Sequence, residues 1–282
     1  MSVLFCRWYA IIEAKGGAHM VTKELIQQRA VFLSTLCRDL EQESWVRGFF
    51  LAGHTLQGQD DPYSDIDLRL IVIDKKAKRQ VYEWLATWSP DLLFIEELND
   101  VNASFYFEHF IKLKVLAYYA SELEPSIWFK QIQVVWDPEG MIEPMRQSSL
   151  ALELSVNQAM IDHYLTKYYA HLHTLCRGMM RGEINYCMQC ILMMRNILSA
   201  LWCLEKGHLP NDIGDWSRYE GARSVLSQAQ QQWMQKVISL DKQSVRQFCL
   251  DANKQIKQVL VRFGYDTHQF DRLTLHVLEE TH

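Results

Sequence analysis

Hydrophobic and polar positions follow two different patterns along this chain, and the change comes near residue 150. Before it, short apolar runs alternate with amphipathic stretches, which predicts strands mixed with helices. After it, apolar residues recur at helical spacing and glycines separate the segments, which predicts helices alone. The expected fold is α+β: a small mixed β-sheet domain over residues 22–148, followed by an all-α helical bundle over residues 149–282.

The first half is expected to form two helices and several short strands. One helix should run from an N-cap at Thr22 to about Glu43, and a basic amphipathic helix should cover 75–88. A loop with a short helical turn is expected between the first two strands, up to Pro62. The strands themselves are expected at 46–53, 66–73, 92–98, 103–110, 111–119 and 132–135.

Beyond residue 150 the pattern predicts five helices. Gly182, Gly207 and Gly264 stand between them, as is common where helices end. Met179 and Met180 belong to a set of methionines that we expect to fill a core or a groove, since this side chain is flexible and apolar. The helices are expected near 152–180, 183–206, 221–239, 242–263 and 268–280.

Composition places the chain among folded globular proteins and excludes some partners. Its 282 residues suit one large domain or two ordinary ones, and 49% of them are hydrophobic. The net charge of −5 indicates no broad basic face, so nucleic acid is not an expected partner. No run of about 18 apolar residues is evident, so no membrane partner is expected.

Seven cysteines, an odd number, stand mostly in apolar helical contexts. Buried free thiols in a reducing compartment explain them most simply, and a cytoplasmic location is therefore expected. The spacing of Cys187 and Cys190 also occurs in redox and zinc sites, but the two lie within an apolar helix without a partner pair, which favours packing. The oligomeric state stays open, and a homodimer is compatible with the sequence.

Two carboxylates stand two residues apart where the second predicted strand begins. Because side chains alternate along a strand, Asp65 and Asp67 are expected on one face, with Ile66 and Leu68 turned into the core. Like charges a few ångströms apart repel, which costs stability unless a cation lies between them. Mg²⁺ prefers oxygen ligands and commonly takes one or two carboxylates together with substrate phosphates. The pair therefore predicts a magnesium site.

The residues before the pair make the pattern more specific than Asp-x-Asp alone, which is usually a solvated strand edge. Gly53 ends the preceding strand and permits a turn whose backbone can approach a phosphate closely. A spacer containing Gly58 follows, and Ser64 then stands directly before Asp65. The amides of a following helix N-terminus would add donors for an anion.

Gly53, Gly58 and the run 61–68, Asp-Pro-Tyr-Ser-Asp-Ile-Asp-Leu, resemble the signature of the nucleotidyltransferase superfamily that includes polymerase β. The likeness is greatest to the aminoglycoside and lincosamide nucleotidyltransferases, whose signature is Gly-Ser, a spacer with a second glycine, and Ser-Asp-x-Asp. A weaker likeness to their helical domain runs through 181–183, 207–210 and Trp216, so that the resemblance covers about residues 25–265.

This resemblance implies a nucleotidyltransferase domain that uses Mg²⁺ and takes ATP or another nucleoside triphosphate as its donor. Asp65 and Asp67 are then the metal ligands and the catalytic carboxylates. The residues expected to bind the nucleotide are Gly53, His54, Thr55, Ser64 and Lys114.

Two positions depart from the family pattern. The serine after the first glycine is His54, whose imidazole can donate to a phosphate but is bulkier than a hydroxyl. The family's third carboxylate, on a later strand, is replaced in the best alignment by Lys114, which would repel a second metal ion or take over its charge against the phosphates. Glu96, Glu97 or Glu108 can supply a displaced acid, although a solvated surface position suits each of them.

Two functions follow from these observations. The first is transfer of a nucleoside monophosphate from a triphosphate to a hydroxyl of a small molecule similar to an aminoglycoside or lincosamide. That acceptor is expected in a cleft between the two domains. The second is a catalytically degenerate homologue that binds nucleotide, or regulates a partner, without turnover. The Asp65 and Asp67 pair favours the enzyme, whereas His54 and Lys114 favour the second function.

Overall fold

The computed structural model describes residues 18–53, 63–98 and 102–279. The chain divides into two compact units, Met1–Glu153 and Leu154–His282. The first unit contains a six-stranded sheet with helices, and the second is helical. The α+β class, with a mixed sheet followed by a helical region, is therefore confirmed.

The sheet of the first unit has the strand order β3-β4-β5-β2-β1-β6. Strands β2 and β5 pair in parallel and the other neighbours pair antiparallel, so the sheet is mixed as predicted. Each predicted strand is present, with ends shifted by at most three residues. The strands are β1 (Val46–Ala52), β2 (Ile66–Val72), β3 (Leu92–Leu98), β4 (Asn102–Phe107), β5 (Ile111–Tyr119) and β6 (Gln133–Trp136).

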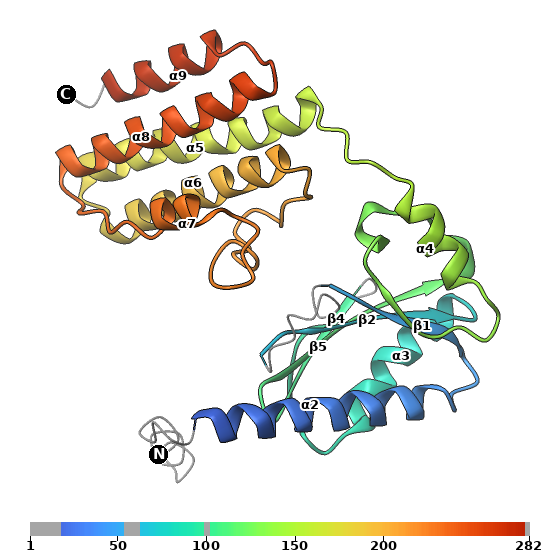
Figure 1. Ribbon diagram of the computed structural model, residues 1–282. Helices are drawn as coiled ribbons and strands as arrows, with labels where there is room; N and C mark the ends of the chain where they lie inside the picture. The colour runs from blue at the N-terminus through green and yellow to red at the C-terminus, as the bar shows by residue number, and fades with distance from the viewer. Residues whose placement is uncertain (1–17, 54–62, 99–101, 280–282) are drawn as a thin grey trace. The chain divides into compact units, whose positions relative to one another are not determined.

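Helices α2 (Ala18–Leu40) and α3 (Lys75–Trp88) cover one face of this sheet (Figure 1). Their apolar side chains share a core with Leu68 and Leu113 of the sheet, both fully buried. On the opposite face, α4 (Ile142–Leu150) covers only the end of the sheet near β1 and β6, through a smaller apolar cluster. The remainder of that face carries the polar side chains that concern function.

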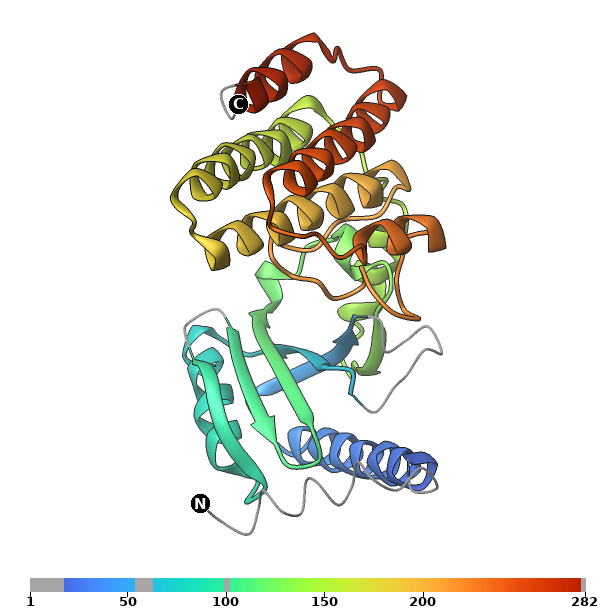
Figure 2. The ribbon, with the colours of Figure 1, turned by 90° about the vertical axis from the view of Figure 1, so that its left-hand side faces the viewer.

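In the second unit, α5 (Gln158–Arg181), α6 (Ile184–Glu205) and α8 (Lys242–Arg262) lie alongside one another, as Figure 2 shows. The short α7 (Gln228–Met234) and the final α9 (His268–Glu279) complete the unit. By length and composition α6 could cross a membrane, but 72% of its apolar window is buried inside the protein. That burial is typical of a central helix in a bundle core.

Four helices differ from the predictions, and side-chain caps explain where three of them begin. The first helix begins at Ala18, so Thr22 lies inside it rather than at its N-cap. The helix α4 was not predicted; the carboxylate of Asp137 accepts hydrogen bonds from three backbone amides and starts it. Asn157 caps α5 well after residue 152, and Ser227 caps α7, which ends at Met234 instead of 239.

Six cysteines lie in the described part of the chain, and all six are buried free thiols, as predicted. Burial raises the pKa of the thiols of Cys176 and Cys190 to about 11. These side chains are therefore neutral packing groups. The short helical turn predicted between the first two strands lies outside the described residues.

Candidate functional site

The open face of the sheet carries the two carboxylates of the sequence motif. Asp65 directly precedes β2 and Asp67 is its second residue. Ile66 and Leu68, which alternate with them, are buried in the core on the other face, as predicted. The same alternation brings Arg69 onto the open face beside Asp67.

Lys114 lies beside this pair. In the parallel pairing of β2 with β5, Lys114 is the register partner of Asp67. Its Nζ atom is 3.2 Å from Oδ2 of Asp65, and both side chains are about two-fifths exposed, at 45% and 40%. The position where the family resemblance places a third acid is thus occupied by a cation in contact with the first acid.

Asp67 has its own basic partner. Nη2 of Arg69 donates to Oδ2 of Asp67 at 2.9 Å, and the two side chains are only 17% and 22% exposed. Burial raises the pKa of Tyr118 on β5, while the neighbouring Arg69, to which Tyr118 is hydrogen-bonded, opposes that rise. The repulsion expected between two carboxylates is therefore offset by two side-chain cations, one for each acid.

One oxygen of Asp67 is left over. Oδ1 is buried and has no hydrogen-bond partner among the residues that the structure describes, and the same holds for Nε of Arg69. A buried acceptor without a donor costs about 1–3 kcal/mol, so such atoms commonly bind water, an ion or a ligand. That Oδ1 of Asp67 lacks a donor among the described residues is the observation that points most directly to a bound cation.

Gly53 follows β1 and stands over this carboxylate. Its φ angle is +89°, in the region that L side chains rarely adopt. A Cβ atom built on it would lie 3.8 Å from Cβ and 4.0 Å from Oδ2 of Asp67. The backbone therefore passes close to Asp67 with no side chain between, as a phosphate-binding turn requires. The next residues, His54 and Thr55, lie outside the described residues, and their predicted roles stay predictions.

The turn that carries Asp65 is fixed from the other side of the sheet by Arg29 of α2. Arg29 is 7% exposed; its Nη1 donates to the carbonyl of Ser64, and its Nη2 donates to that of Asp65 at 3.3 Å. Ser64 itself is buried, so any contact with a nucleotide requires that it become accessible. Arg29 is not recognisable as a site residue from the sequence, because nothing local marks a contact across 35 residues.

Among the proposed replacements for the third acid, Glu96 is already engaged. It accepts a hydrogen bond from the Tyr106 hydroxyl, which lowers the pKa of Glu96, and lies 3.7 Å from Nζ of Lys112. Burial lowers the pKa of Lys112, but its hydrogen bond with Tyr106 and the negative charge of Asp65 raise it more. Strands β4 and β5 separate β3, which carries Glu96, from β2, which Asp65 directly precedes.

Of the other two acids, only the side chain of Glu108 is described, and it offers no better replacement. Glu108 is exposed in the turn that joins β4 to β5, and the side chain of Glu97 lies outside the described residues. Within the described ranges, no group of three or more histidine, cysteine or acidic side chains is placed to hold a metal ion.

The residues present fit one Mg²⁺ ion rather than two. Asp65 and Oδ1 of Asp67 offer carboxylate ligands, and Mg²⁺ often completes its shell with phosphate oxygens and water. A second ion needs a further acid, and Lys114 stands in its place with a positive charge. Besides the two carboxylates, the site presents the basic side chains of Lys114 and Arg69, so the chemistry that it offers a ligand is electrostatic.

Comparisons with known proteins give distant likenesses only. No protein-family model matches the chain, and no curated protein matches its sequence. An aminoglycoside 6-adenyltransferase from Bacillus subtilis is 14% identical, with 86% of this chain and 94% of that chain covered and a TM-score of 0.36. A nucleotidyltransferase-like protein from Exiguobacterium sibiricum 255-15 is 12% identical, with coverage of 88% and 72% and a TM-score of 0.33.

A third solved structure, that of the GLD-2/RNP-8 complex, is 14% identical, covers 81% of this chain and 68% of that chain, and has a TM-score of 0.29. Two of the three names are nucleotidyltransferase names, the class that the sequence motif resembles. At this distance the likenesses do not fix an activity, so the proposed function rests on the residues of the site.

Proposed function

We propose that this protein binds a nucleoside triphosphate with one Mg²⁺ ion on the open face of its sheet. The observation that carries the proposal is the buried Oδ1 of Asp67, which has no hydrogen-bond partner among the described residues. The Asp67 side chain also lies beside the turn at Gly53, where no side chain intervenes. Asp65 and Asp67 would hold the metal, and the backbone after β1 would approach the phosphates.

The basic side chains of the site suit a triphosphate better than a bare metal ion. Without ligand, Lys114 and Arg69 neutralise Asp65 and Asp67. When a metal ion takes over the carboxylates, the two cations become available to phosphate oxygens, with which Arg and Lys both pair well. Metal and triphosphate are therefore expected to bind together, each compensating the charge that the other brings.

Binding without two-metal transfer is the function that this geometry supports best, because Lys114, where the resemblance implies a third acid, is the register partner of Asp67. The second candidate is transfer of a nucleoside monophosphate to a hydroxyl of a small molecule of the aminoglycoside or lincosamide kind. The complete Asp65 and Asp67 pair favours it. Lys114 would then neutralise phosphate charge in place of the second ion, and positioning would supply much of the rate.

Calorimetry with ATP, GTP, CTP and UTP tests the proposal, each with Mg²⁺ and with EDTA. We expect at least one triphosphate to bind, about tenfold or more tightly with Mg²⁺, since tenfold corresponds to only about 1.4 kcal/mol. Asp67→Asn should abolish this metal dependence, and Asp91→Asn, at an exposed position outside the site, should leave it unchanged. Equal binding in Mg²⁺ and EDTA, or no binding of any triphosphate, contradicts the proposal.

Incubation of the same protein with labelled ATP and a panel of amino sugars and lincosamides separates the two candidates. Release of pyrophosphate that depends on the acceptor, and that is lost in Asp67→Asn, establishes transfer. Tight binding of Mg²⁺-triphosphate without pyrophosphate release, for every acceptor in the panel, supports the non-catalytic function.

A further inference from the structure

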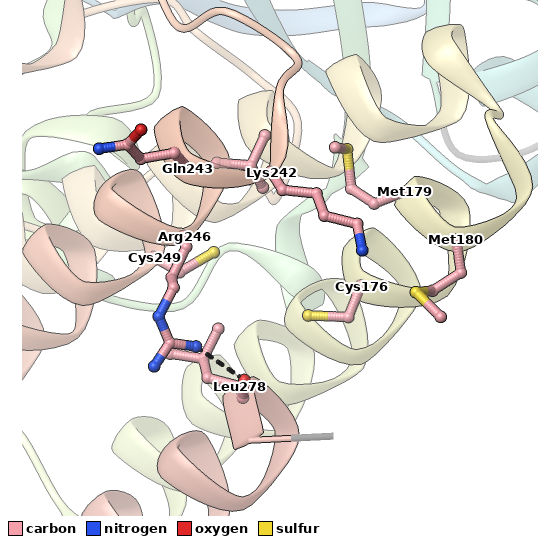
Figure 3. Close-up of a pocket in the computed structure, with 9 residues that line it drawn as sticks. Cys176, Met179, Met180, Lys242, Gln243, Arg246, Cys249 and Leu278 are labelled. Carbon is pink, nitrogen blue, oxygen red and sulfur yellow. Dashed lines mark hydrogen bonds between the residues drawn. The ribbon is translucent and has the colours of Figure 1, made fainter. Parts of the chain in front are cut away.

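A cavity of about 340 Å³ opens within the helical unit, among α5, α8 and α9 (Figure 3). Its volume lies at the small end of the roughly 300–1,000 Å³ that ligand pockets occupy. Most of its lining is apolar or sulfur-containing. The side chains concerned are Cys176, Met179 and Met180 of α5, Val245 and Cys249 of α8, and Leu278 of α9.

Two cations of α8 stand at this apolar cavity. Lys242 and Arg246 are one helical turn apart, so their charges share one side of the helix. Figure 3 shows the Lys242 side chain extending toward α5 and that of Arg246 toward Leu278, to whose carbonyl oxygen Nη1 donates at 2.8 Å. In the described part of the chain, neither cation forms an ion pair with a carboxylate.

This combination is unusual for a cavity that serves packing alone. Like charges one turn apart repel each other, and apolar surface beside them stays in contact with water. No acidic residue is among the described side chains that line the cavity. An anion between the two cations would relieve their repulsion, and an apolar tail attached to it would displace water from the thioether and aliphatic walls.

We propose that this cavity binds a small anion with an apolar tail, of the class of medium-chain carboxylates. The carboxylate would lie between Lys242 and Arg246, and the tail would enter between Met179 and Met180 on one side and Val245 on the other. Methionine walls suit such a ligand, because unbranched thioether side chains adapt to the shape of what they contact. The proposal is independent of the nucleotide site, which belongs to the other unit.

Calorimetric titration of the full chain with nonanoate, nonanol and nonylamine tests the proposal. The three probes have similar tails and carry a negative, a neutral and a positive head. Nonanoate should bind about tenfold more tightly than nonanol, because its head gains charge-assisted hydrogen bonds, and nonylamine should bind most weakly. Equal affinity for nonanoate and nonanol, or no binding of nonanoate, overturns the proposal.

Lys242→Met supplies the matched variant, and Lys254→Met the control. Both lysines are exposed on α8, but only Lys242 lines the cavity, so neither change should impair folding. Lys242→Met should weaken nonanoate about tenfold and leave nonanol unchanged, while Lys254→Met should change neither. An equal loss of nonanoate affinity in both variants means that general surface charge attracts the carboxylate, and the specific site is then rejected.

Discussion

At the scale of single residues, the proposed site differs from the pattern that it resembles chiefly at Lys114. Asp65 and Asp67, the proposed metal ligands, each form an ion pair with a basic neighbour. The cation beside Asp65 comes from β5, where the resemblance implies an acid. The positive charge of Lys114 is compatible with binding of a polyanion and one metal ion, and it opposes binding of a second metal ion.

Lys114→Asp reverses that charge. The change removes a cation 3.2 Å from Asp65 and adds a carboxylate at the register position opposite Asp67. We expect Mg²⁺ to bind at least about tenfold more tightly, since both changes favour a divalent cation even with partial solvent screening. Pyrophosphate release from Mg²⁺-ATP should appear or increase. Titration calorimetry and a pyrophosphate assay measure the two effects.

Lys114→Met is the control for this prediction, because it removes the positive charge without adding a ligand. It should raise Mg²⁺ affinity less than Lys114→Asp and should not create pyrophosphate release. If Lys114 instead contacts the phosphates, both variants weaken triphosphate binding. An unchanged affinity for metal and triphosphate in both variants contradicts the placement of Lys114 in the site.

At the scale of secondary-structure elements, the sequence predicts strands better than helix ends. A strand on a half-buried sheet shows its alternation directly, and the extents of β3 and β5 agree with their predicted ranges. Helix ends depend on individual caps, such as Asp137 before α4, and a single cap residue leaves no periodic pattern in the sequence. Charge contacts of the site, such as Arg29 with the turn at Ser64, arise from folding and leave no local pattern.

Arg29→Met tests how firmly α2 holds the start of β2. The change removes a buried guanidinium that donates to the carbonyls of Ser64 and Asp65. Hydrogen bonds from charged donors are worth about 1.5–3 kcal/mol, so the free energy of unfolding should fall by about 1–3 kcal/mol. Affinity for Mg²⁺-triphosphate should fall as well, because the turn carries Asp65. Urea unfolding and calorimetry measure the two quantities.

Arg38→Met on the same helix is the matched control. Arg38 is exposed, and among the described residues its ion-pair partner is the neighbouring Asp39. A surface pair of this kind contributes about 0–1 kcal/mol, so stability and triphosphate affinity should change little. Equal effects of the two substitutions would mean that the Arg29 contacts do not hold the turn.

The start of α8 gives a prediction about pH. Asp241 caps this helix, and hydrogen bonds from the backbone amide and the hydroxyl of Ser244 lower its pKa to about 2. An unfolded aspartate has a pKa of about 3.9. Because the folded pKa is the lower one, this contribution to stability is complete above the unfolded pKa and disappears as the pH falls toward 2.

Asp241→Asn keeps a cap acceptor but does not titrate. The difference in the free energy of unfolding between the parent and this variant should be constant above about pH 5 and should shrink between about pH 4 and pH 2. Urea unfolding at fixed pH values measures it. A difference that does not change down to pH 2 would show that Asp241 keeps the same pKa in the folded and unfolded chain.

At the scale of the whole molecule, the chain has separate cores for its two units. One apolar cluster contains only residues from Leu154 onward, and the two others contain only residues before Glu153. A compact unit with its own core can fold by itself. The nucleotide site proposed above is built entirely from the first unit, and the cavity proposed for an anion lies entirely in the second.

Separate expression of fragments 1–153 and 154–282 tests this division. Each fragment should show cooperative unfolding, because its buried side chains find their partners within the same unit. Mg²⁺-triphosphate at a hundredfold excess over its Kd should stabilise fragment 1–153 by about 2.7 kcal/mol, since binding to the native state adds to stability. Fragment 154–282 should not respond to the nucleotide.

Nonanoate should have the reverse effect, stabilising fragment 154–282 and leaving fragment 1–153 unchanged, because Lys242, Arg246 and the cavity walls belong to the second unit. Thermal unfolding of both fragments with each ligand gives four measurements. A fragment that is unfolded alone but folds when its partner is added would show that the cores depend on each other. Nucleotide that stabilises the full chain but not fragment 1–153 would show that triphosphate binding requires residues of the second unit as well as Asp65 and Asp67.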